Sequence, residues 1–468
     1  MSLENLGRLA GFAPALAVCI LLASAPRPSI AQAANSAGTG TTFAIVDTNQ
    51  TLCYGIEANF ELRSCPSAGD ELYGQDANYT INPPAYRDNG DGTISDLVTG
   101  LMWQKGFTRN VDWNAAPDLA ARADTGGHTD WRVPGTKELY SLLDFSGHQG
   151  SGDPSSTSVP HNAVPFMNTD IFDFEYPTTN RYIDAQYITS TAYTGLALGN
   201  KSFMGVNFAD GRIKGYPQVP PGMQRGWYIR LVRGNPEYGK NVFQDKGDGT
   251  VTDTATGLAW MQGDSGNQTF AGILNRNHFQ DGRMDWPEAL RFCESLNFAS
   301  AEDWRLPSAK ELQGLVDYSR SPKATNSAAL DPVFQISSIT DEADNANFPG
   351  FWTSTTLLDG RQPGSDSVVV FFGEALGAPG RMGAPGAGGG RPPRPPMHGQ
   401  MTGPDQHGGG PPPQMPNSGG KIIDVHGAGA QRSDPKTGDA DDYPVWGHGP
   451  QGDVRRVYNH VRCVRTAG

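Results

Sequence analysis

The sequence is short of basic residues: 36 Lys and Arg stand against 49 Asp and Glu among 468 residues, and the formal net charge is -13. Proteins that bind nucleic acid or other polyanions need basic surfaces, so this balance argues against both classes of partner. Histidine is scarce as well, and the nine residues form no Ser-His-Asp or His-x-x-x-His grouping. The sequence therefore offers no catalytic constellation, and we expect a protein that is not an enzyme.

Long apolar runs are missing after the first 34 residues, so no later stretch is suited to spanning a bilayer. The run from 9 to 25 follows Arg8 and precedes Ala31-Gln32-Ala33, an arrangement typical of a secretory signal and its cleavage site. We predict a signal peptide over residues 1–33, with a retained N-terminal anchor as the alternative. The mature protein is then expected to be exported to the periplasm, the cell surface or the extracellular medium.

Glycine and proline, by contrast, are abundant, with 59 and 36 residues, which indicates a turn-rich chain. A chain of this length usually forms more than one domain, and a repeat marks the domains here. The motif Asp-Trp-Arg-x-Pro-x-x-Lys-Glu-Leu occurs at 130–139 and again at 303–312. Upstream of the two copies, ten of sixteen positions are identical between 88–103 and 245–260. We therefore predict two related modules.

The bounds of the modules follow from this repeat. We place a lead-in at 34–85, module one at 86–234 and module two at 235–468. Between about 375 and 442, module two contains a Gly/Pro-rich segment with too few apolar residues to offset the entropy of ordering. We predict a disordered insertion there, just before the last strand of the module.

Each module is predicted to contain a hairpin, two helices and a small antiparallel sheet, which is an α+β fold. A Gly-Asp-Gly turn followed by β-branched residues opens each hairpin. In module two, Asp285 and Glu288 predict the start of the first helix. Ser308 and Glu311 form the capping box of the second helix.

Four of the five cysteines lie outside the predicted signal peptide. Cys53 and Cys65 of the lead-in are predicted to close a small disulfide loop, as is usual in an oxidising compartment. Cys293 and Cys463 are both present in module two, and module one has neither at the matching positions. Joint presence and joint absence predict a second disulfide between them, with two free buried thiols as the alternative.

Two acidic turns provide candidate metal ligands, and calcium is the ion that their carboxylates would suit. The six residues are Asp88, Asp91, Asp96, Asp245, Asp248 and Asp253. Their spacing departs from the EF-hand pattern, and Asp and Gly are also the residues that tight turns require. We therefore favour a structural role and expect no cofactor, with calcium binding as the alternative.

Two further features of the repeat are interpreted as structural. Five tryptophans could stack on sugars, but their fixed places in the modules favour packing in the core. They are Trp103, Trp131, Trp260, Trp304 and Trp352. Arg132 with Glu138, and Arg305 with Glu311, are predicted to form ion pairs that orient the second helix rather than acid–base pairs.

These motifs resemble those of the Lcl C-terminal domain family, which takes its name from the Legionella collagen-like protein and was long catalogued as a domain of unknown function. The resemblance rests on Asp-Gly-Thr…Thr-Gly-Leu-x-Trp, Asp-Trp-Arg-Leu-Pro-x-x-x-Glu-Leu, Trp-Thr-Ser-Thr and Val-Arg-Cys-Val-Arg. It covers about 243–466 and, without the cysteines, about 86–234. More distantly, the chain is similar to domains of C-type-lectin-like fold, including the formylglycine-generating-enzyme group. The resemblance implies two tandem α+β modules of C-type-lectin-like fold whose surface loops bind a ligand.

This organisation favours an exported, non-enzymatic binding or adhesion protein that recognises a glycan or protein ligand through loops of its modules. Two other classes stay open. One is a structural protein of the cell envelope that makes contacts through the Gly/Pro-rich segment. The other is a remote enzyme of formylglycine-generating type, which would need a reactive cysteine pair close together in a cleft.

Overall fold

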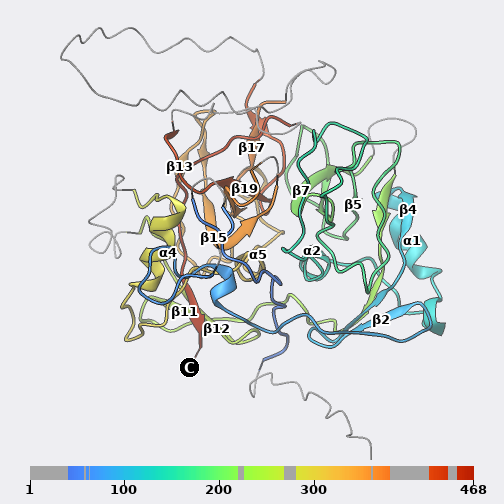
Figure 1. Ribbon diagram of the computed structural model, residues 1–468, viewed down its shortest axis with the longest axis horizontal. Coiled ribbons are helices and arrows are strands. Elements are labelled where there is room, and N and C mark those ends of the chain that lie inside the picture. The colour runs from blue at the N-terminus through green and yellow to red at the C-terminus, as the bar shows by residue number, and fades with distance from the viewer. Residues whose placement is uncertain are drawn as a thin grey trace, which may run out of the picture. The chain divides into compact units, whose positions relative to one another are not determined.

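A computed structural model describes residues 41–56, 60–62, 64–219, 226–267, 281–359, 362–379, 421–440 and 451–467. These residues belong to one unit, Ala37–Gly468, while the predicted signal peptide falls in a separate unit, Met1–Ser36, that lies outside the described residues. The described unit is mixed α+β, with many short strands and few short helices (Figure 1). The α+β prediction is therefore confirmed at this level.

Module one follows the predicted order of hairpin, helices and strands. The side chain of Asp112 accepts a hydrogen bond from the Asn114 backbone amide and caps the turn before the first helix. A 3₁₀ turn, η1 (Asp76–Asn78), lies in the lead-in. The elements of module one are β1 (Tyr86–Asp88), β2 (Thr93–Asp96), β3 (Leu101–Gln104), β4 (Thr108–Val111), η2 (Trp113–Ala115), α1 (Ala116–Ala121), η3 (Thr125–Gly127), α2 (Thr136–Tyr140), β5 (Gln186–Tyr187), β6 (Ser202–Asn207), β7 (Arg212–Pro217), β8 (Trp227–Ile229) and β9 (Val232–Gly234).

Module two repeats this order. Asp285 and Ser308 both accept from the backbone amide three residues later, and both helix starts have the predicted capping box. The elements of module two are β10 (Phe243–Asp245), β11 (Thr250–Asp253), β12 (Leu258–Met261), α4 (Trp286–Glu294), α5 (Ala309–Gly314), α6 (Pro322–Thr325), β13 (Ile339–Thr340), β14 (Ala346–Asn347), β15 (Gly350–Leu357), β16 (Asp366–Phe371), β17 (Leu376–Gly377), β18 (Ile423–Asp424), β19 (Gln431–Pro435) and β20 (Val464–Thr466). Among the described residues, no helix is long and apolar enough to cross a membrane.

Each module has a four-stranded antiparallel sheet, and the two sheets have the same order and register. They are β1-β2-β3-β9 in module one and β10-β11-β12-β20 in module two. Leu101 faces Gly234 in the first, and Leu258 faces Thr466 at the equivalent place in the second. In both modules the last strand therefore returns to the opening hairpin.

A third, eight-stranded sheet joins the modules. Its order is β15-β16-β19-β7-β6-β5-β8-β4, so that three strands come from module two and five from module one. The junction lies between β19 and β7, which pair antiparallel at Gln431 and Ile213 (Figure 1). The main hydrophobic core likewise contains buried residues of both modules. The modules therefore pack against each other and are not independent domains joined by a linker.

The predicted insertion at about 375–442 is wrong at both of its ends. β17 lies just inside its first boundary, and β18 and β19 lie before its second. Arg432 on β19 is 2% exposed, and its guanidinium donates to the carbonyls of Leu376 (2.9 Å) and Val454 (2.8 Å). Buried polar side chains thus hold these strands, which is why a shortage of apolar residues in the sequence concealed them. Residues 380–420 and 441–450 lie outside the described part.

Candidate functional site

The repeated motif places one arginine and one glutamate together in each module. The backbones of Arg132 and Arg305 form bridges to the last strands, at Val232 and Val464. The glutamate of each motif occupies the third position of the following helix, where its carboxylate accepts from the backbone amide of the N-cap residue. The arginine and glutamate therefore connect a strand to a helix start.

In both modules the predicted ion pair forms with two parallel hydrogen bonds. The Arg132 guanidinium donates to both carboxylate oxygens of Glu138 at 2.6 Å. The Arg305 guanidinium donates to those of Glu311 at 2.7 and 2.6 Å. Burial alone would raise the pKa of Glu311, but Arg305 and the Ser308 hydrogen bonds lower it below its ordinary value. We call these pairs the motif sites of module one and module two.

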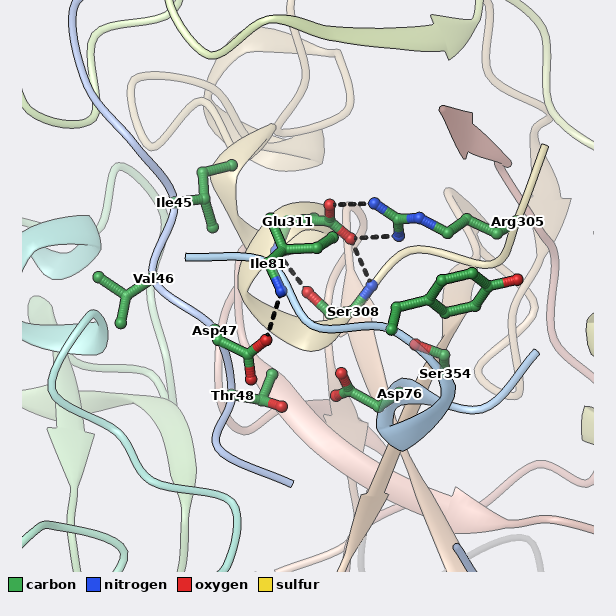
Figure 2. Close-up of a pocket in the computed structure, with 11 residues that line it drawn as sticks. Ile45, Val46, Asp47, Thr48, Asp76, Ile81, Arg305, Ser308, Glu311 and Ser354 are labelled. Carbon is green, nitrogen blue, oxygen red and sulfur yellow. Dashed lines mark hydrogen bonds and ion pairs between the residues drawn. The ribbon is translucent and has the colours of Figure 1, made fainter. Parts of the chain in front are cut away.

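The motif site of module two is covered by the lead-in. A small cavity of about 10 Å³ lies there, which is the space of one water molecule, and Figure 2 shows side chains that line it. Its walls come from the lead-in, the motif and β15. They are Ile45, Val46, Asp47, Thr48, Asp76, Tyr79, Ile81, Arg305, Ser308, Glu311 and Ser354.

Two lead-in side chains make the principal contacts over this site. The carboxylate of Asp76 accepts from the Thr355 hydroxyl, and the Asp76 side chain is aimed into the cavity. The ring of Tyr79 lies 5.2 Å from the Arg305 guanidinium, a cation–π contact. The Tyr79 hydroxyl donates to Glu294 at 2.6 Å. Burial is the main cause that raises the pKa of Asp76 to about 7.

The motif site of module one is open. The Arg132 side chain is 36% exposed, whereas that of Arg305 is 8% exposed. Ser190 is exposed and Thr191 is half-buried, while their counterparts in module two, Ser354 and Thr355, are buried. The two sites therefore share one geometry and differ in whether another segment lies on them.

This repeated strand-to-helix geometry agrees with what a comparison of sequences finds. The family model of the Lcl C-terminal domain matches residues 92–233 and 249–380, which together exceed half of the chain. The chain belongs to the Lcl C-terminal domain family. The suspected resemblance, with two tandem copies, is thereby confirmed. No curated protein and no solved structure matches the chain.

The second Lcl C-terminal domain extends beyond its matched residues. β19 and β20 lie after residue 380, and β20 pairs with β12 in the way that β9 pairs with β3 in the first domain. Arg465 of β20 also forms an ion pair with Asp303 at 2.6 Å, equivalent to Arg233 with Asp130 at 2.6 Å. The last strand thus completes the second copy from the far side of the Gly/Pro-rich segment.

Both predicted disulfides of this Lcl-type chain are present. Cys53 is bonded to Cys65, and Cys293 is bonded to Cys463 across a sequence separation of 170 residues. Cys293 and Cys463 are fully buried. The second bond joins α4 to the residue just before β20 and is absent from the first Lcl C-terminal domain.

The six candidate calcium ligands serve as hydrogen-bond acceptors in turns. One carboxylate oxygen of Asp91 accepts from both the backbone amide (3.0 Å) and the hydroxyl (2.6 Å) of Thr93, and Asp248 binds Thr250 in the same way. These hydroxyl bonds lower the pKa of both aspartates. Within the described ranges, no group of three or more His, Cys, Asp or Glu side chains is arranged to hold a metal ion.

The other four acidic residues are engaged similarly. The carboxylate of Asp88 accepts from Lys105 and from a backbone amide of its turn, and that of Asp245 accepts from the Gln262 side chain and from the turn. Asp96 and Asp253 are buried and accept hydrogen bonds from backbone amides of the turn that follows each, and Asp253 also accepts from the Val242 amide. The turn interpretation accounts for their contacts.

The five motif tryptophans belong to the interior, as the preferred interpretation expected. They are at most 4% exposed: Trp103, Trp131, Trp260, Trp304 and Trp352. The indole N–H groups of Trp131 and Trp304 donate to the carbonyls of Thr125 (3.1 Å) and Phe298 (3.0 Å), at equivalent places of the two modules. These tryptophans present no stacking surface for a sugar.

A lysine in both copies of the motif connects the modules, and the sequence reasoning missed it. Lys137 Nζ donates to the Gly314 carbonyl at 2.7 Å, and Lys310 Nζ donates to the Ser141 carbonyl at 2.9 Å. Gly314 and Ser141 each lie four residues after the lysine of their own motif, so the contacts are reciprocal. Each ammonium sits at the C-terminal end of the other module's helix, where carbonyls favour a cation. Burial lowers the pKa of both lysines to about 8.

A second missed feature is a buried arginine before the end of each module. Arg230 donates to the carbonyls of Gln104 and Lys105 in module one, and Arg462 donates to those of Met261 and Gln262 in module two. Both side chains are fully buried, and burial lowers the pKa of both. The signal was available in the sequence, because an arginine stands at this position of the final strand region in both copies.

Proposed function

We propose that the protein is an exported, non-enzymatic binding protein, and that the open motif site of module one is part of its ligand-binding surface. The observation that carries this proposal is the contrast between the copies. One motif site is covered by a segment of the chain, and the equivalent site keeps a guanidinium, Arg132, whose side chain is 36% exposed. Ser190 is exposed at the place of Ser354, which lines the cavity with Arg305 in module two. Exposed arginine next to hydrogen-bonding groups is a frequent feature of recognition surfaces.

Several observations support the other parts of the proposal. Two disulfides suit an oxidising compartment outside the cytoplasm. Cys293 and Cys463 are bonded and buried, so neither offers the accessible thiol that a formylglycine-generating type of chemistry needs. The C-type-lectin-like fold implied by the family resemblance belongs to the proposal as well, since such folds carry ligands on loops rather than in a deep cleft.

The experiment is a binding comparison between the full-length protein and a variant that blocks the open site. Ser190→Tyr places a large side chain at the exposed position equivalent to Ser354, which lines the cavity with Arg305 in module two. Val219→Tyr, at a residue that is 70% exposed, is the matched control. The three proteins are applied to a glycan array and to immobilised envelope proteins of the source cell. We expect a ligand that binds the parent and Val219→Tyr equally and loses at least tenfold in affinity for Ser190→Tyr. Ligands that bind all three proteins equally would overturn the assignment of this surface.

A further inference from the structure

The lead-in behaves as a ligand that the chain carries for its own second module. Its carboxylate, Asp76, takes the hydrogen bond of the Thr355 hydroxyl. Its ring, Tyr79, lies on the Arg305 guanidinium. The two side chains are three residues apart and are presented by the single turn η1. Module two therefore shows which chemistry a motif site accepts: a carboxylate followed three residues later by an aromatic ring.

Module one offers the same groups without the segment that would use them. Thr191 Oγ1 accepts from the Thr136 amide at 3.1 Å, as Thr355 Oγ1 accepts from the Ala309 amide at 2.9 Å. The Thr355 hydroxyl in turn donates a hydrogen bond to the Asp76 carboxylate. Within the described part of the chain, the hydroxyl of Thr191 donates to no acceptor.

The backbone around these hydroxyls is also the same in both copies. The Ser190 amide donates to the Pro134 carbonyl at 2.8 Å, and the Ser354 amide donates to the Pro307 carbonyl at 2.8 Å. The Arg132 guanidinium donates to Glu138 and to the Gly234 carbonyl (3.2 Å), its side chain is still 36% exposed, and among the described side chains no aromatic ring lies over it. Hydroxyl and guanidinium are thus held in the same frame in both modules.

We propose that the motif site of module one binds a segment of another protein that carries an Asp or Glu three residues before a Phe or Tyr. This partner class rests on the proposed function and names the ligand of the same surface. The carboxylate would accept from the Thr191 hydroxyl, and the ring would lie on the Arg132 guanidinium. Ala121 stands where module two has Glu294, the acceptor of the Tyr79 hydroxyl. A ring without a hydroxyl is therefore accepted equally well.

The chain's own lead-in does not serve as this partner, because its contacts are already made. Besides Asp76 and Tyr79, the Gln50 side chain bonds the backbone of Thr356 in both directions, at 2.8 and 2.9 Å. The lead-in of a second copy is held in the same way. The occupant of the site is therefore a separate protein. Because the equivalent site of module two binds a peptide segment, we expect this site to bind a peptide rather than a glycan.

The test uses the lead-in sequence itself as the probe. A synthetic peptide of residues 74–82, Gly-Gln-Asp-Ala-Asn-Tyr-Thr-Ile-Asn, is titrated by calorimetry into the full-length protein. We expect saturable binding at one site. A peptide with Asp76→Asn or Tyr79→Ala should bind about tenfold more weakly, because each change removes roughly 1–2 kcal/mol of contact.

Variants of the protein locate the site. Thr191→Val removes the hydroxyl and should lower the affinity for the peptide about tenfold. Thr191→Ser keeps the hydroxyl and should restore binding, which separates loss of this donor from misfolding. Thr194→Val, at an exposed neighbour, is the matched control and should bind like the parent.

Three outcomes would overturn the inference. They are no saturation with the peptide, binding that Thr191→Val leaves unchanged, and equal binding of the Asp76→Asn peptide. If a glycan bound the parent and lost affinity for Ser190→Tyr while the peptide failed to bind, the partner class would be wrong and the proposed function would stand. If neither ligand responded to Ser190→Tyr, the proposed function would fail as well.

Discussion

The two motif sites share the bidentate Arg–Glu ion pair and the bond from the N-cap amide to the glutamate, and they differ in their surroundings. Arg305 and Glu311 are 8% and 2% exposed in their side chains, whereas Arg132 and Glu138 are 36% and 10% exposed. The repeat thus fixes the ion pair, the bond from the glutamate to the N-cap amide and the sheet register. A segment outside the repeat decides which site meets solvent. Duplication of a structural frame allows one copy to be covered by the chain and the other to stay available.

The first and largest effect is expected from the disulfide that only module two has. Cys293→Ala with Cys463→Leu introduces the residues that module one has at the matching positions. Loss of a cross-link with a separation of 170 residues should lower the free energy of unfolding by about 4–5 kcal/mol, measured by urea denaturation.

The control for this loss is the disulfide of the lead-in. Cys53→Ser with Cys65→Ser opens a loop with a separation of 12 residues, and the same loop-entropy relation gives about 3 kcal/mol. If both double variants lost the same free energy of unfolding, the stabilisation by these disulfides would not come from the length of the loop that each one closes.

The second comparison breaks the two ion pairs. Glu311→Gln keeps an oxygen for the capping box but leaves the buried Arg305 charge uncompensated, so the free energy of unfolding should fall by about 3–5 kcal/mol at pH 7. Glu138→Gln should cost about 1 kcal/mol or less, because solvent screens the more exposed Arg132. Similar costs in both modules would show that the difference in burial is unimportant.

This second comparison also has a pH dependence. The pKa of Glu311 is lower in the folded protein than in the unfolded chain. Its contribution to stability is therefore present above the unfolded pKa, near 4.5, and is lost as the pH falls through the folded pKa. The gap between the parent and Glu311→Gln should shrink as the pH is lowered below about 4.5.

The third prediction concerns the reciprocal lysines. Burial lowers the folded pKa of Lys310 to about 8 from 10.5, so the unfolded chain binds more protons between these values and stability rises with pH. Between pH 8 and 9.5 the parent should gain about 2 kcal/mol relative to Lys310→Met, measured by denaturation at each pH. Lys137→Met should give a similar difference, because burial lowers the pKa of Lys137 to about 8 as well. A flat difference for Lys310→Met would refute the buried-ammonium interpretation.

The smallest effect has the opposite sign and comes from a turn. Ala299 and Ser300 of module two have φ of 51° and 59°, in the left-handed region, whereas the matching residues of module one are glycines, Gly126 and Gly127. Ala299→Gly and Ser300→Gly should each raise the free energy of unfolding by about 0.5–1 kcal/mol, since glycine relieves the steric cost of positive φ. Thermal melting of each variant measures this gain.

The reverse change in module one is the control for the turn. Gly126→Ala would place a Cβ 2.6 Å from Thr93 Cγ2 in addition to the positive φ, and it should destabilise the protein. A gain in stability from Gly126→Ala would mean that the two turns are not equivalent.

The ion pairs and helix starts of the repeat could be predicted from the sequence, because the residues that form each of them lie within a few positions of one another. Arg305 and Glu311 are six residues apart, and Asp285 caps α4 through an amide three residues later. The Cys293–Cys463 bond is distant in sequence, yet comparison of the copies revealed it, since both cysteines are missing from module one. Repetition supplied the long-range information that a single module would have lacked.

The cover over module two could not be predicted in this way. Asp76 meets Thr355 across 279 residues of sequence, and the lead-in has no second copy with which to compare it. β19 was missed because its buried side chains are polar and satisfied by distant carbonyls, so that hydrophobic periodicity gave no signal. Contacts without periodicity and without repetition leave no pattern in one sequence.

The Cys293–Cys463 bond also determines what a protease could achieve. β17 and β18, which stand on either side of residues 380–420 in the sequence, pair at Leu376 and Asp424. A single cut at any peptide bond between the two cysteines would leave two fragments that are still one covalent molecule. On a gel the nicked protein would migrate as one band without reductant and as two bands with it.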